Sequence, residues 1–153
     1  MALRPDRIHV DSQIDFFMNE AAERGGIACI STVGSGAAMD QSEQLASYVA
    51  APSGEAPLGI LICDMVNLDL TRQHENWYKE EVQQGGKVTI WPKCTVVTDR
   101  IYPGQTPTAG QTAYVVHSGY IGNSDFIGGN LVVGKFLSTK DEDGYCKVSV
   151  NLP

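Results

Sequence analysis

Hydrophobic and polar residues alternate along short stretches of the chain, and turns rich in glycine and proline separate these stretches. The first alternation covers residues 8–18, where every second position except Ser12 is apolar: Ile8, Val10, Ile14, Phe16 and Met18. A period of two predicts a strand with one apolar face, because successive side chains of a strand point to opposite sides. Two interpretations stay open. The strand packs on the core of its own domain, or residues 1–18 form an extended N-terminal arm that packs on a neighbouring subunit.

The rest of the chain, residues 19–153, predicts a single β-rich domain. Small, polar, glycine and proline residues over about 34–57 show no sustained period, which predicts a long surface loop with one helical turn near 43–48. The segment after Pro57 is the most apolar of the chain and is rich in branched side chains. This composition favours a strand buried on both faces, at the centre of the core.

One short helix is expected over residues 72–82. Asp69 or Thr71 can cap it, since both side chains accept hydrogen bonds from the free N–H groups of a first helical turn. Further strands are predicted at 87–91, 94–101, 114–117, 131–137 and 145–152. Pro92 marks a bulge, an edge or a strand break, because proline cannot donate to a ladder. The Asp-Gly pair at 143–144 is typical of a hairpin turn.

These elements predict a mainly β protein. Seven or eight short strands with regular turns describe a small β-barrel or sandwich, to which the short helix and the N-terminal arm are added.

Charge and hydropathy exclude two classes of partner. The chain has 18 acidic and 11 basic side chains, a formal charge of −7, whereas proteins that follow phosphate backbones are basic. Nucleic acid is therefore not an expected partner. No apolar stretch approaches the roughly 20 residues that cross a bilayer, so no membrane association is expected. The N-terminal residues lack the apolar core of a secretory signal, which predicts synthesis in the cytoplasm.

The four cysteines, Cys29, Cys63, Cys94 and Cys146, are widely spaced and form no Cys-x-x-Cys pair, so no metal site is expected. Each is either a small buried hydrophobic residue or a partner in a disulfide, within or between subunits. The histidines are equally scattered. No constellation argues for catalysis or for a cofactor, and this favours a binding or structural role.

Several segments together resemble the head decoration proteins, or capsid cement proteins, of tailed bacteriophages. The resemblance covers roughly residues 15–150 and rests on the order of a Pro-Leu-Gly-Ile-Leu strand, an Asp-Leu-Thr-Arg-x-His segment, a Gly-Gly-Lys-Val-Thr strand and a closing Val-Gly-Lys-Phe-Leu…Asp-Gly-Tyr hairpin. It implies a β-barrel protein of the virion that binds the outer surface of an icosahedral head, commonly as a trimer. There it would clamp neighbouring subunits of the major capsid protein.

The resemblance also sharpens two expectations. The arm becomes the candidate contact with the capsid or with another subunit, through the alternating apolar residues of 8–18. The cysteines depart from the family pattern, which strengthens the disulfide hypothesis. Charge divides the chain as well: residues 1–76 hold 11 acids and 4 bases, whereas residues 77–153 hold 7 of each. We expect the acidic half to carry the arm and the neutral half to form most of the barrel.

Two other functions remain as alternatives. A phage tail or host-recognition module would expose aromatic side chains, for which Trp77, Tyr78 and Trp91 are the candidates. A small β-barrel enzyme would need a pocket that brings together at least two of Asp64, His74 and His117.

Overall fold

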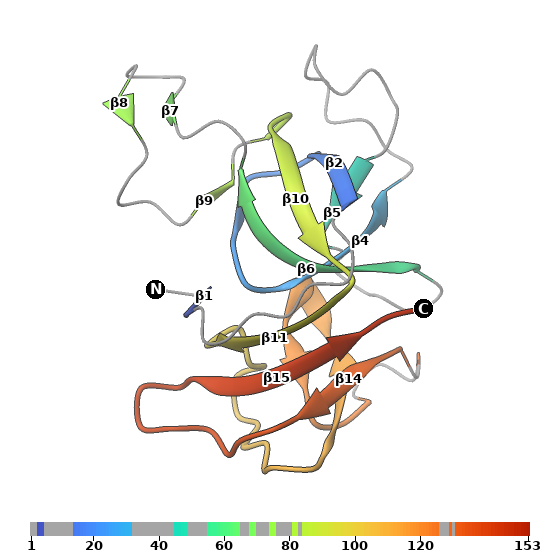
Figure 1. Cartoon of the computed structure of the whole chain (residues 1–153), viewed down its shortest axis with the longest axis vertical. Coiled ribbons are helices and arrows are strands. Elements are labelled where there is room, and N and C mark those ends of the chain that lie inside the picture. Colours follow the sequence, from blue (N-terminus) through green and yellow to red (C-terminus); the bar gives the residue numbers. More distant parts are fainter. Residues whose placement is uncertain are drawn as a thin grey trace.

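The computed structural model describes residues 3–4, 14–31, 45–48, 55–64, 68–69, 74–75, 81–82, 84–125, 129 and 131–153. These residues form a mainly β protein with two parts, a closed five-stranded barrel and a curled six-stranded sheet (Figure 1). The predicted fold class is confirmed.

The barrel strands follow the order β10-β2-β5-β4-β6 around the closed ring. Their bounds are β2 (Ile14–Met18), β4 (Ile27–Ser31), β5 (Leu45–Ser47), β6 (Pro57–Asp64) and β10 (Lys87–Trp91). All pairs are antiparallel except β2 with β5, which is parallel.

The sheet has the order β1-β11-β15-β14-β12-β13. Its strands are β1 (Leu3–Arg4), β11 (Lys93–Thr98), β12 (Thr112–Val115), β13 (Ile121–Gly122), β14 (Val132–Phe136) and β15 (Cys146–Asn151). Two small ribbons pair β3 (Ala22–Glu23) with β9 (Glu81–Val82), and β7 (Leu68–Asp69) with β8 (His74–Glu75). A single 3₁₀ turn, η1, covers His117–Gly119.

Strands β4 and β6 connect the barrel to the sheet, because each of them contributes buried side chains to the cores of both parts. Ala28 and Leu61 belong to the cluster inside the barrel, whereas Ile27 and Ile60 pack into the core of the sheet. All four side chains are fully buried. The apolar segment after Pro57 was predicted to be a strand buried on both faces, and its residues Ile60 and Leu61 confirm this.

Pro92 lies where the chain passes from barrel to sheet. Strand β10 ends at Trp91 and β11 begins at Lys93, so the residue without an N–H group falls between two ladders. Its carbonyl oxygen accepts from the N–H of Leu152 at 3.0 Å. The predicted strand break is confirmed.

The turn at 141–144 connects β14 with β15 as the Asp-Gly signature predicts. The N–H of Gly144 donates to the carbonyl oxygen of Asp141 at 3.1 Å, and the N–H of Tyr145 donates to the Asp141 carboxylate at 2.7 Å. Gly144 has φ +93°, a conformation that glycine adopts without strain.

The N-terminal arm differs from the expectation. Residues 14–18 are strand β2, which pairs with β10 on one side and β5 on the other, so this part of the predicted arm is an integral barrel strand. Met18 is fully buried and Phe16 packs against the same cluster. Ile8 and Val10 lie outside the described residues, as does the side chain of Ile14. Of the two interpretations of the alternation, packing on its own domain holds for 14–18.

The predicted loop and helix also require correction. Residues 45–47, predicted as part of the loop and near a helical turn, form β5 and close the barrel, because Leu45 and Ala46 bury their side chains between β2 and β4.

In the segment predicted as a helix, the described residues His74–Glu75 and Glu81–Val82 are strands. Val82 is fully buried opposite Ala22. A short isolated helix is marginal in water, so such pairing can override local preference.

The distribution of charge over the two parts is the reverse of the expectation. Four of the five barrel strands lie in the acidic N-terminal half, and five of the six strands of the open sheet lie in the neutral C-terminal half.

Candidate docking face

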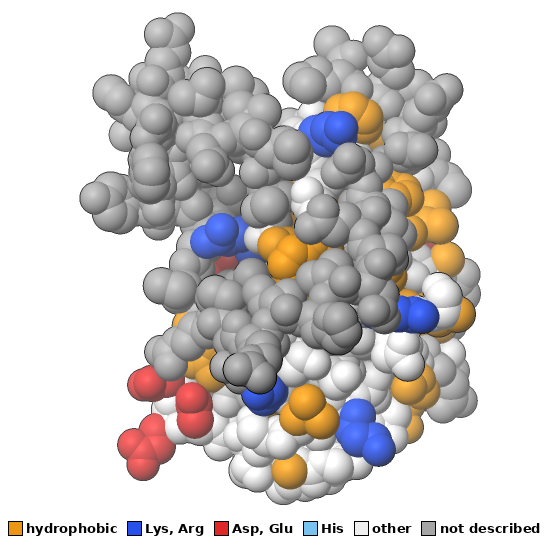
Figure 2. Space-filling model, in the orientation of Figure 1, with side chains coloured by type: hydrophobic (Ala, Val, Ile, Leu, Met, Phe, Trp, Pro, Cys, Tyr) orange, Lys and Arg blue, Asp and Glu red, His pale blue; other side chains and the backbone are white. Residues whose placement is uncertain are grey.

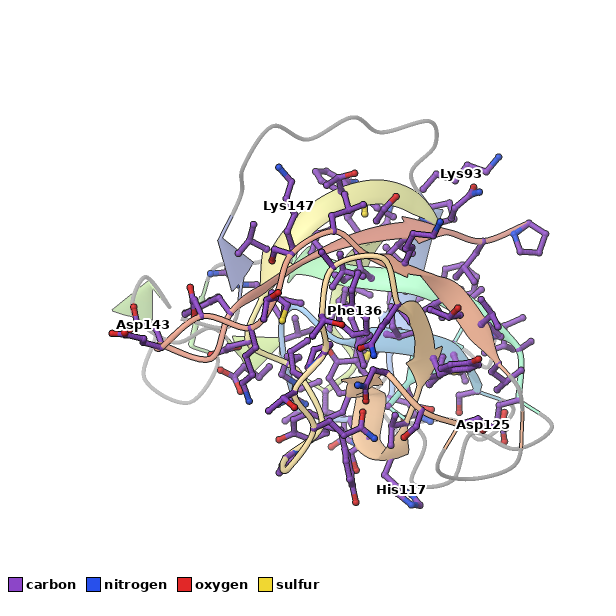
Figure 3. The ribbon with its side chains drawn as sticks, turned by 90° about the horizontal axis from the view of Figure 1, so that it is seen from below. Lys93, His117, Asp125, Phe136, Asp143 and Lys147 are labelled. Atoms are coloured by element: carbon purple, nitrogen blue, oxygen red, sulfur yellow. The ribbon has the colours of Figure 1, made fainter. Side chains whose placement is uncertain are left out.

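The curled sheet has one buried face and one face toward solvent. Side chains alternate along its strands, so that Val96, Phe136 and Val148 point into the core. The opposite side is called the outer sheet face below, and its residues are Lys93, Thr95, Val97, Thr112, Tyr114, Val132, Lys135, Leu137, Lys147, Ser149 and Asn151. Figure 3 shows Lys93 and Lys147 extending from the same side of the sheet, with Phe136 on the inner side.

Strand register brings residues of this face together from distant parts of the sequence. Ser149 lies opposite Thr95 on one side and opposite Lys135 on the other. Lys93 lies opposite Asn151 in the same ladder. The centre of the outer sheet face therefore consists of small polar side chains, and Lys93 and Lys135 lie beside them.

Two large apolar side chains are exposed on the outer sheet face. Val132 is 49% exposed and Leu137 is 45% exposed, and both flank the same strand, β14. Ile30, at 42%, is the remaining exposed large hydrophobic residue in the described part of the chain. Single exposed apolar side chains are normal at a surface, so these two distinguish the outer sheet face only together with its charge.

Among the described residues, the outer sheet face carries lysines and no carboxylate. The acidic residues described beyond position 84 all lie in turns and loops: Asp99, Asp125, Asp141, Glu142 and Asp143. Figure 2 shows basic and hydrophobic side chains interspersed over the sheet, while acidic side chains gather at its lower left end. In a chain of net charge −7, the absence of acids among the described residues of this face makes the face distinct.

A second cluster, built around Tyr48, lies where barrel and sheet meet. The Tyr48 hydroxyl donates to the carbonyl oxygen of Glu23 at 2.6 Å and accepts from the N–H of Gly26 at 3.0 Å. Burial raises the pKa of this hydroxyl well above its usual range, although nearby Arg100 acts in the opposite direction. The phenol therefore stays neutral and can donate its hydrogen bond at all ordinary pH values.

Arg100 connects this tyrosine to the sheet. Its guanidinium lies over the ring of Tyr48 at 5.3 Å and over the ring of Tyr120 at 4.5 Å, within the range of cation–π contacts. It also donates to the Glu23 carboxylate at 3.1 Å and to the carbonyl oxygen of Ser118 at 3.3 Å. These contacts join β3, the end of β5 and the η1 turn, and we interpret the cluster as structural.

Three of the four cysteines are free thiols buried in the core of the sheet: Cys29, Cys94 and Cys146. Burial raises the pKa of Cys29 and of Cys94 to about 12, and that of Cys146 to about 11. Thiolates attack disulfides and alkylating agents, so these protonated, buried thiols should be unreactive in the folded protein. A disulfide between subunits at any of the three would require the core to open. The side chain of Cys63 lies outside the described residues.

Thiol labelling tests the buried positions of Cys29, Cys94 and Cys146. We expect iodoacetamide at neutral pH to modify at most one cysteine in the native protein and all four in denaturant, counted by mass spectrometry. Rapid native labelling of Cys29, Cys94 or Cys146 would contradict the buried positions.

The same three thiols predict that the protein is less stable at alkaline pH, since their pKa values are higher in the folded state than in the unfolded state. Their contribution to stability is complete below about pH 9 and is lost as the pH rises through 11 to 12.

Among the residues named for the alternative functions, the structure describes the side chains of Trp91 and His117. Trp91 is half-buried against the core of the sheet, with its indole nitrogen buried, rather than presented as a binding platform. His117 lies in the η1 turn beside the ring of Tyr102, at 6.3 Å between centroids. Trp77 and Tyr78, and the side chains of Asp64 and His74, lie outside the described residues.

The part of the chain that the structure describes contains no candidate metal site and no candidate membrane helix. No group of three or more histidine, cysteine, aspartate or glutamate residues there is placed to hold a metal ion. Among the same residues, no helix is long and apolar enough to cross a membrane.

Comparisons with known proteins give no assignment. No protein-family model matches the chain. No curated protein matches it with significant similarity.

Proposed function

We propose that this protein is a structural virion protein that decorates the capsid of a tailed bacteriophage. In this role it is made in the host cytoplasm, binds the outer surface of the icosahedral head and clamps neighbouring subunits of the major capsid protein. Several copies, most simply a homotrimer, act together. The starting point is the sequence resemblance over residues 15–150, and the described structure adds a surface suited to the task.

The observation that carries the proposal is the outer sheet face with its two exposed aliphatic side chains, Val132 and Leu137. A cement protein works through a surface rather than through a catalytic pocket. It needs a rigid body that presents apolar and polar groups over a broad area. Antiparallel strands with a buried opposite face hold such groups in fixed positions.

Symmetry makes weak contacts on such a face sufficient. Each capsid offers many equivalent positions, and a symmetric oligomer engages several of them at once. Once one subunit has docked, the others bind at a high effective concentration, so that the avidity exceeds the affinity of a single contact by orders of magnitude.

Co-sedimentation with undecorated phage heads tests the proposal. We expect saturable binding of the purified full-length protein, with the amount bound at saturation set by the capsid lattice. The oligomeric state should be measured alongside by light scattering, where a trimer is expected. Failure to co-sediment with expanded heads of the phage that encodes the protein would contradict the assignment.

A further inference from the structure

We infer that the outer sheet face docks on an acidic protein surface, which under the proposed function is an acidic patch on the exterior of the phage head. The inference rests on the proposed function and adds the contact surface and the chemistry of the partner. Three features of the face support it: its lysines, the lack of carboxylates among its described residues, and its exposed aliphatic residues.

The charge of the face is the first step of the argument. Lys93 and Lys135 lie on β11 and β14, on either side of β15, and Lys147 lies on β15 itself. Within the described residues, neither Lys93 nor Lys135 forms an ion pair with a carboxylate. The positive charge at these two positions is therefore available to an external acidic group.

The arrangement of acidic residues is the second step. The described carboxylates beyond position 84 lie in turns and loops, and Asp141, Glu142 and Asp143 are consecutive residues of one turn, in which Figure 3 labels Asp143. The protein as a whole carries −7, so an acidic partner would be repelled by most of its surface. Opposite charges at an interface speed association and fix orientation, and like charges suppress wrong encounters. The outer sheet face is thus the surface that an acidic partner can approach.

The apolar residues explain why the partner is a protein rather than a polyanion. Val132 is the first residue of β14 and Leu137 directly follows that strand, so the two flank Lys135 in sequence. Interfaces between proteins bury apolar side chains beside polar and charged ones, whereas binding to a phosphate backbone depends on basic charge over the whole contact. The net charge of −7 opposes binding to a phosphate backbone.

Single charge reversals test the inference in the full-length protein. We expect Lys135→Glu and Lys93→Glu each to weaken binding to undecorated heads by about tenfold, because each turns an attraction into a repulsion that recurs in every linked subunit. Lys140→Glu is the matched control. It makes the same change in net charge but lies in the hairpin loop between β14 and β15, beyond the face, so its binding should stay within about twofold of wild type.

Salt dependence provides a second readout. Raising the salt from about 50 mM to about 500 mM should weaken wild-type binding severalfold, since charge pairs at a rim are screened. The same increase in salt should weaken the binding of the Lys135→Glu variant by a smaller factor. Each variant is first checked by thermal unfolding, which a surface lysine should shift by no more than a few degrees.

The outcomes separate the inference from the proposed function. If wild-type protein does not bind heads at all, the proposed function fails. If wild type binds, but both face variants bind as tightly as Lys140→Glu and salt has no effect, the inference is overturned and the proposed function stands. If wild-type protein also binds free duplex DNA, and the face variants lose that binding, the face is a nucleic-acid site and the inference is wrong.

Discussion

Deletion of residues 1–18 should abolish the folded barrel. The deletion removes β2, whose neighbours β10 and β5 would both lose their pairing partner and leave the ring open. Met18 would be lost from the centre of the barrel, together with the hydrogen bonds that its N–H and carbonyl group form with Gly86 and Gly85. Removing one buried side chain of this size typically costs about 2–5 kcal/mol, against a total stability of about 5–15 kcal/mol. Loss of a whole strand that pairs on both sides should cost more free energy than loss of one buried side chain.

The measurement is thermal unfolding followed by circular dichroism, with deletion of residues 1–13 as the control. The shorter deletion keeps β2 and removes only β1 from the described strands, at the edge of the sheet. We expect it to melt cooperatively, and the longer deletion to show no cooperative transition. A wild-type melting curve after deletion of residues 1–18 would mean that the whole segment is a detachable arm. Capsid-binding experiments on arm deletions should therefore use the shorter form.

Replacement of Gly134 by alanine should destabilise the sheet by about 3 kcal/mol, at the upper end of the usual cost of overpacking. A β-carbon at this position would collide with the carbonyl oxygen of Ser149 on β15 and would lie 3.1 Å from the Cα atom of Val150. The obstacle is backbone of the paired strand, which cannot rotate away as a side chain can. The ladder between β14 and β15 must then separate locally, and the centre of the outer sheet face shifts with it.

Gly110→Ala is the matched control for this substitution. Gly110 has φ +92°, but nothing lies within 4 Å of the position that a β-carbon would occupy. Its substitution meets backbone strain alone, for which about 1–2 kcal/mol is expected. Denaturant unfolding of both variants at the same pH compares the two costs. Equal losses would mean that the strands β14 and β15 adjust freely and that close packing at Gly134 contributes little.

Local chemistry made much of the fold predictable. The alternation at 14–18 is a strand, the branched apolar residues after Pro57 are buried on both faces, and Pro92 separates two ladders. The Asp-Gly pair forms its turn. Each of these features depends on the period of a few residues, on the missing N–H of proline or on the backbone freedom of glycine. Such properties act over one strand or turn and need no knowledge of the neighbours.

Pairing between distant segments was not predictable in the same way. Residues 45–47 lack a recognisable pattern because three residues are too few for a period, and they become a strand only between β2 and β4. The described residues of the expected helix form short two-stranded ribbons, and there too the pairing partner lies outside the segment. Glu23, Tyr48 and Arg100 form one cluster across more than 70 positions of sequence.

The sequence by itself determined that this protein is a β-rich, acidic chain with turn-bounded strands, since composition and short-range alternation are written in the order of residues. Only the tertiary structure decided which strands close the barrel and which form the open sheet. It also decided that Lys93, Lys135, Val132 and Leu137 share one face, on which no described residue is a carboxylate. The register between β11, β15 and β14 creates that surface, and register is a property of paired strands that no single segment contains.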